Sequence, residues 1–104
     1  MKKDFPSHYT EMKEQFPEYF DAVEQMGNAL REAGPIKEKC AHLIQLAASV
    51  AIRSEGGVHS HTRRAIEAGA SAEEIRHSLI LLTSTLGFPT VMAGMSWVND
   101  ILEE

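Results

Sequence analysis

The sequence has a single cysteine, Cys40, among its 104 residues. One thiol cannot close an internal disulfide, and it cannot supply the Cys-x-x-Cys pair of many zinc and redox centres. The chain also lacks an apolar run of the ~18 residues that a membrane-spanning helix needs. No apolar stretch follows the two lysines near its start, as a secretory signal would require. We therefore expect a cytoplasmic protein with a reduced thiol and no membrane partner.

Positive charge is scarce as well, with 10 Lys and Arg residues against 15 Asp and Glu residues and a net charge of −5. Nucleic-acid binding relies on clustered Lys and Arg side chains, so no nucleic-acid partner is expected. Hydrophobic residues make up 43% of the chain, which is enough to form a buried core. The length is typical of one domain, and we expect residues 1–104 to form a single one.

Strand signals are missing, because no alternating apolar and polar run is flanked by turn residues. Apolar residues recur instead at three- and four-residue steps, which is the spacing of one helix face. The sequence therefore predicts an all-α fold of five to six helices. The expected helices cover residues 4–16, 17–34, 36–54, 54–69 and 71–86, and a last one follows the Gly-Phe-Pro break at 87–89.

Two serines give the clearest signals for helix starts. Ser71 and Glu74 have the spacing of a capping box, in which each side chain bonds to the other residue's backbone amide. Ser54 can cap the helix that follows the most apolar segment. Gly56 and Gly57 come next and allow close packing in the first turn of that helix, where free amides attract anions. Ser54, Gly56 and Gly57 are therefore candidate ligand-binding residues.

His61 lies on the same helix, on a face with small or apolar residues such as Val58 and Ala65. Two interpretations are open. In the first, the imidazole is a core histidine bonded to a carbonyl group. In the second, it lies in a pocket near the helix start and moves a proton on a bound anion. His61 is then the candidate catalytic residue, and His42 on the preceding apolar helix is a second one, because a polar ring there needs a partner.

The other candidate ligands give weaker signals. His59 precedes His61 by two residues, about 200° around a helix, so it is expected to face away from His61 at the surface. If His42, His61 and His77 converged, three imidazoles could hold zinc with an open fourth position. The sequence has no local zinc motif such as His-Glu-x-x-His, however, and we expect no metal. Cys40 is expected to be a small buried hydrophobic residue.

A long stretch of the chain resembles the carboxymuconolactone decarboxylase and alkylhydroperoxidase D-like superfamily; it reads LIQLAASVAIRSEGGVHSHTRRAIEAGASAEEIRHSLILLTSTLGFP. The features that carry the resemblance are the apolar helix, the histidine followed by RRAIEAGAS, the EEI helix start and the GFP break. The resemblance extends from Pro35 to Trp97. It implies an alkylhydroperoxidase D-like helical domain that assembles into a homo-oligomer, a trimer or a hexamer.

The peroxidase branch of that superfamily uses Cys-x-x-Cys followed by x-x-x-His, with a glutamate on the preceding helix. In this sequence the motif falls on Ser54, Gly57 and His61, and the glutamate position falls on His42. Both thiols are missing, and thiol–disulfide exchange needs an attacking and a resolving thiol. We therefore expect no thiol peroxidase chemistry, and these residues do not support a family-level label of peroxiredoxin activity.

The decarboxylase branch acts on a small acidic lactone, needs no cysteine pair and has a histidine at the position of His61. The resemblance therefore implies a decarboxylase-related or other acid–base enzyme that takes a small acidic metabolite and needs no cofactor. The segment before His61 departs from that branch, so its substrate is not carried over. Two alternatives stay open: a non-catalytic ligand-binding or oligomeric protein, and a metal protein with histidine ligands.

Overall fold

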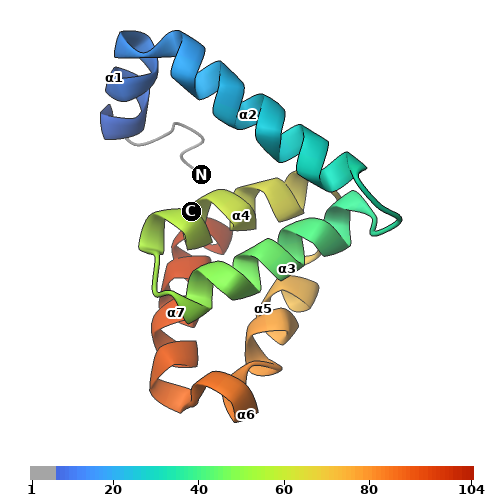
Figure 1. Cartoon of the computed structure of the whole chain (residues 1–104). Coiled ribbons are helices and arrows are strands. Elements are labelled where there is room, and N and C mark those ends of the chain that lie inside the picture. Colours follow the sequence, from blue (N-terminus) through green and yellow to red (C-terminus); the bar gives the residue numbers. More distant parts are fainter. Residues whose placement is uncertain (1–6) are drawn as a thin grey trace. The chain divides into compact units, whose positions relative to one another are not determined.

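The computed structural model describes residues 7–104, which are helical almost throughout and contain no strand, so the predicted all-α class is confirmed. The chain divides into two compact units after Ile36, and the expectation of a single domain stays a prediction. The first unit holds α1 (Ser7–Gln15) and α2 (Pro17–Glu32), and the second holds α3 (Glu38–Ala51), α4 (Glu55–Glu67), α5 (Ala72–Ile80), α6 (Thr83–Leu86) and α7 (Phe88–Leu102) (Figure 1). Residues 4–6 of the first predicted helix lie outside the described part.

None of the described helices is both long and apolar enough to cross a lipid bilayer.

In the first unit, an ion pair and an aromatic pair join α1 to α2. Lys13 Nζ lies 3.1 Å from Glu24 Oε1, and this hydrogen-bonded carboxylate raises the pKa of Lys13 above its ordinary value. The rings of Tyr9 and Phe20 meet edge to face with centroids 5.3 Å apart, a favourable aromatic geometry. Pro17 begins α2, where its missing N–H costs nothing because the first amides of a helix have no partner within it.

The core of the second unit is formed by apolar side chains from four helices. Because α3, α4, α5 and α7 each bury one face, removal of these side chains from water is the main stabilising contribution to this unit. The fully or almost fully buried residues are Leu46, Val50, Val58, Ala65, Ile75, Leu79, Val91, Val98 and Ile101. Figure 1 shows α3 and α4 running side by side in opposite directions, with α7 and α5 packed around them.

A tight turn reverses the chain between α3 and α4. The amide of Ser54 donates to Ser49 O at 2.9 Å and the amide of Arg53 donates to Val50 O at 3.0 Å, the paired bonds of a Schellman motif. Arg53 has a φ of 56°, although glycine is the usual residue in this left-handed position. Ser54 then caps α4, because its Oγ accepts from the Gly57 amide at 3.1 Å, as the sequence predicts.

Glycine allows two helix pairs of this unit to approach closely. A Cβ at Gly57 would lie 2.8 Å from Ser49 Oγ, and one at Gly94 would lie 2.8 Å from Val50 Cγ1. Real Cβ atoms do not approach other atoms so closely, so α4 and α7 pack against α3 only because these positions lack a side chain. The prediction that Gly57 permits close packing is confirmed, whereas Gly56 has open space where its Cβ would be.

The helix predicted over 71–86 is interrupted. It starts with the predicted capping box, in which the Glu74 amide donates to Ser71 Oγ at 3.0 Å and the Ser71 amide donates to Glu74 Oε1 at 2.9 Å. It ends at Ile80 and resumes after a turn as the single-turn α6. If α6 is counted with α5, the described residues hold six helices, as predicted. Glu74 also reaches Lys39 Nζ at 3.0 Å, which ties α5 to α3.

We expect Gly57→Ala to destabilise the protein by about 1–3 kcal/mol, because the new methyl group overlaps Ser49. Gly56→Ala is the matched control in the same helical turn. It should be neutral or stabilising by up to about 1 kcal/mol, since alanine favours helix and nothing lies near the added atom. Urea unfolding followed by circular dichroism measures both values. Equal effects of the two substitutions would contradict the packing at Gly57.

Glu74 should make stability depend on pH in the acid range. The Ser71 amide and then Lys39 lower the pKa of its carboxyl group below the ordinary value of 4.5. A lowered folded-state pKa stabilises the protein above the unfolded-state value, and that stabilisation is lost as pH falls through the folded-state value. Glu74→Gln should therefore be less stable than wild type at pH 7 and approach it in stability near pH 3.

The matched control for this measurement is Glu73→Gln, which removes the same charge one residue earlier without touching Ser71 or Lys39. Urea unfolding at both pH values compares the variants with wild type. If Glu74→Gln lowers the stability equally at neutral and acid pH, the ionised carboxylate is not what stabilises the wild-type protein.

Candidate functional site

The two predicted catalytic histidines lie next to each other. His42 is in the first turns of α3 and His61 is in the middle of α4, and their ring centroids are 5.8 Å apart with the planes tilted by 39°. Rings at this separation are in contact range. Only 2% of His42 is exposed, whereas His61 is partly exposed. The pair therefore has one ring in the interior and one that solvent reaches.

A carboxylate lies beside the buried member of this pair. Glu38 is one helical turn before His42 on α3, and its Oε1 lies 3.8 Å from His42 Nε2. The Glu38 side chain is mostly exposed, at 70%. His42 therefore has a carboxylate that extends to solvent on one side and the His61 ring on another. Sequence analysis did not single out Glu38, although the four-residue spacing that joins it to His42 is visible in the chain.

The predicted ligand-binding residues at the start of α4 are mostly bonded to one another. Ser54 Oγ accepts from the Gly57 amide, so this amide is not available to a bound anion. Gly57 also lies directly against the buried Ser49. Gly56 is exposed and has open space beside it. Of the three residues, Gly56 is therefore the one with room for an approaching anion, and a ligand-binding role for the set stays a prediction.

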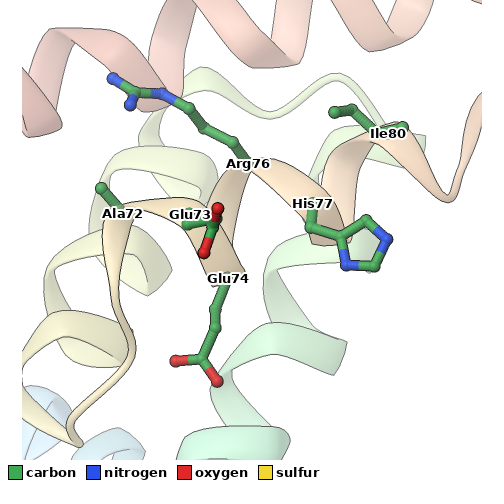
Figure 2. A pocket seen from close by; sticks show the side chains of 6 residues that line it. All are labelled: Ala72, Glu73, Glu74, Arg76, His77 and Ile80. Atoms are coloured by element: carbon green, nitrogen blue, oxygen red, sulfur yellow. The ribbon is translucent and has the colours of Figure 1, made fainter.

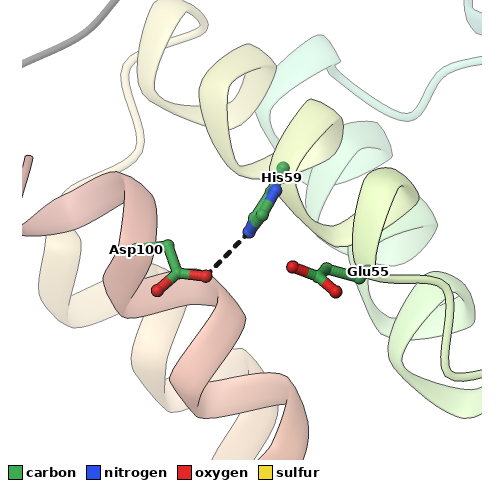
Figure 3. Close-up of side chains that lie close together, drawn as sticks. All are labelled: Glu55, His59 and Asp100. Carbon is green, nitrogen blue, oxygen red and sulfur yellow. Dashed lines mark hydrogen bonds and ion pairs between the residues drawn. The ribbon is translucent and has the colours of Figure 1, made fainter. Parts of the chain in front are cut away.

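His59 lies at the surface, as the sequence predicts, but it has a partner there. Its side chain is only 21% exposed, and its Nε2 lies 3.0 Å from Asp100 Oδ2 on α7 (Figure 3). The ring does turn away from the side of α4 that carries His61, as expected for residues two apart. The sequence did not reveal this partner, because a contact over 41 positions of sequence leaves no local signal.

His77 does not join the other histidines. It is exposed on α5, beside an open hollow of about 730 Å³ that is lined by Ala72, Glu73, Glu74, Arg76, His77 and Ile80 (Figure 2). Within this hollow, Arg76 reaches toward α7, where its Nε donates to Asn99 Oδ1 at 3.0 Å. Among residues 7–104, no group of three possible metal ligands contains His42, His61 or His77. The described residues therefore do not form the three-histidine zinc site.

Cys40 is exposed, so the expectation that it is buried was wrong. The buried positions of α3 are His42, Leu46, Ser49 and Val50. Cys40 precedes His42 by two residues, which is about 200° around the helix, and therefore faces the opposite way. The lone thiol lies on the outer side of α3, and the positions that correspond to the paired thiols of the peroxidase motif are occupied by Ser54 and Gly57.

Comparisons with known proteins agree with the fold and the sequence pattern. A family model described as "Carboxymuconolactone decarboxylase family" matches residues 17–100. An uncharacterized protein of Methanocaldococcus jannaschii is 23% identical over 90 residues, which are 86% of this chain and 84% of that protein.

A solved structure is also similar: the crystal structure of an apo carboxymuconolactone decarboxylase family protein from Legionella pneumophila. It matches with a TM-score of 0.77 at 21% sequence identity, over 93% of this chain and 87% of that one. At this level of identity the match shows a shared fold. The resemblance inferred from the sequence is confirmed by the family model together with this fold.

Proposed function

The chain belongs to the carboxymuconolactone decarboxylase family, and we propose that it is an acid–base enzyme that acts through His61 and His42 on a small acidic metabolite. The observation that carries the proposal is the imidazole pair, with centroids 5.8 Å apart and one ring buried. Histidine is the most common group for proton transfer at neutral pH. The resemblance supports the proposal, because both branches of the superfamily have a histidine at the position of His61.

The two rings have different roles in this proposal. His61 is partly exposed, so it is the ring that meets the substrate and exchanges a proton with it. His42 holds His61 in position from the interior, and its contact with Glu38 connects it to an exposed carboxylate. Two protonated imidazoles so close together would repel each other. In this proposal one ring therefore acts as the acid while the other acts as the base.

The preference for an acidic metabolite rests on the family and on the start of α4. The helix dipole favours a negative group there, and Gly56 leaves room for one to approach. The Gly57 amide is already bonded to Ser54, so the first turn offers less anion binding than the sequence suggests. These features define the proposed substrate class as small molecules with at least one carboxylate.

Thiol peroxidase chemistry is not part of the proposal. The peroxidase cycle needs two thiols near the histidine, one to attack the peroxide and one to resolve the product. The only thiol of this chain, Cys40, lies on the outward side of α3. Hydroperoxide reduction by this protein would therefore have to use a group other than a cysteine pair.

Assembly into a homo-oligomer is the second part of the proposal, and exposed apolar side chains support it. Ile80, Leu81 and Phe88 lie close in sequence between the end of α5 and the start of α7, and each is more than half exposed. None of the residues of α2 is buried, and its apolar stripe is exposed as well. Exposed apolar surface of this extent is typical of protein interfaces, and the resemblance points to a trimer or a hexamer.

His61→Ala should lower turnover of a carboxylate-bearing substrate by about 10²–10⁴-fold, the usual worth of a positioned proton-transfer group. Carboxymuconolactone is the first compound to test, followed by other small lactone and keto acids, with product detected by ultraviolet absorbance or mass spectrometry. His77→Ala is the matched control on exposed α5 and should retain full turnover. Unchanged turnover after His61→Ala would contradict the acid–base role. Hydroperoxide reduction that is faster than lactone turnover and persists in Cys40→Ser would also contradict it.

Light scattering at micromolar concentration should give a mass at least three times the 11.5 kDa of one chain. Leu81→Lys should shift this mass toward that of a smaller assembly, because a charge on the apolar surface opposes its burial between chains. Thr85→Lys adds the same charge at an exposed polar position of α6 and serves as the control. A wild-type protein that remains monomeric in this range would contradict assembly.

A further inference from the structure

We infer that Glu55, His59 and Asp100 form a binding site for a divalent transition-metal ion of the zinc type. Each residue offers one ligand atom, and these three atoms all lie within 4.8 Å of one another. Figure 3 shows the three side chains converging from two helices. This site goes beyond the proposed acid–base function, because His59 faces away from His61 and neither carboxylate has a role in the proposed reaction.

The spacing of the three residues suits coordination. Glu55 and His59 are four residues apart on α4, so they lie on one face of the helix, and Asp100 comes from α7. His59 Nε2 already lies 3.0 Å from Asp100 Oδ2. Zinc ligands bind at about 2.0–2.2 Å, so two of them around one tetrahedral ion stand about 3.3 Å apart. The His59–Asp100 distance fits this value. Glu55 is exposed, so its side chain can turn to complete the coordination.

The kinds of donor atom indicate which ion the site would take. One imidazole nitrogen with two carboxylate oxygens suits zinc and neighbouring transition metals, whereas magnesium and calcium prefer oxygen ligands alone. Three protein ligands leave a fourth position for water. The two carboxylates also repel each other at this separation, and a divalent cation removes that repulsion. The direct hydrogen bond between His59 and Asp100 is the competing state, and it leaves Glu55 without a role.

The site would add a link between α4 and α7, which pack against each other and whose ends the ion pair of Arg63 with Glu104 also joins, at 3.7 Å. An ion bound to the folded protein stabilises it in proportion to the logarithm of the ion concentration relative to its dissociation constant. Metal should therefore raise the melting temperature. This readout does not depend on any substrate, so it distinguishes failure of the metal site from failure of the proposed acid–base function.

The test uses the whole 104-residue chain without a tag, treated with EDTA and then titrated with zinc chloride by calorimetry. We expect one zinc ion per chain, a melting temperature raised by several degrees, and no response to magnesium chloride. Glu55→Gln and His59→Gln should each weaken zinc binding at least about tenfold. Because Glu55 is exposed, its substitution retains the fold and keeps the test valid even where His59→Gln unfolds the protein.

His77→Gln is the matched control, since it removes another histidine from an exposed position without touching the site. Zinc binding that is unchanged in this variant and weakened in the two site variants establishes the site. The inference is overturned if zinc does not bind at tens of micromolar, if binding survives His59→Gln in a folded protein, or if binding is lost instead in His42→Gln or His77→Gln.

Discussion

The contact between Ser49 and Gly57 is the constraint on which the candidate site depends. A side chain at position 57 would overlap the Ser49 hydroxyl, so α3 and α4 approach this closely only because Gly57 has none. Ser49 also accepts the Ser54 amide that ends α3 and donates its hydroxyl to Gln45 O at 3.0 Å, which fixes it in place. His42 is seven residues before Ser49 and His61 is four residues after Gly57, so each histidine lies on the same helix face as that contact. The close approach therefore turns both imidazoles toward each other.

The same contact bears on the lost thiol chemistry. The resemblance places the second cysteine of the peroxidase motif at position 57, where this chain has glycine. In this structure the space that such a side chain would occupy is already filled by the hydroxyls of Ser49 and Ser54. A cysteine at this position alone would overlap both hydroxyls, so the two serine side chains or the helices that carry them would have to shift. The absence of thiols is therefore part of how this chain packs, and the chemistry available to it lies with the imidazoles.

Signals within a few residues of sequence predicted most of the fold. The capping box at Ser71 and the serine cap at Ser54 were both visible as short patterns, because helix starts are decided by neighbouring side chains and amides. Features that depend on distant contacts were not visible. The exposure of Cys40 required knowing which face of α3 is covered, and the partner of His59 is Asp100, 41 residues away. The candidate histidines could be named from the sequence, but that His42 and His61 are neighbours required the packing of α3 on α4.

The geometry of α4 separates two kinds of chemistry on one helix. His61 faces α3, where it meets a buried imidazole, and His59 faces α7, where it meets a carboxylate. Because the two residues are about 200° apart around the helix, a change at one does not touch the partners of the other. Both nevertheless depend on where α4 lies, and an ion held between α4 and α7 would restrict that helix from the side opposite the imidazole pair. A metal at His59 would thus act on the proposed proton chemistry only through the position of α4, by holding His61 against His42.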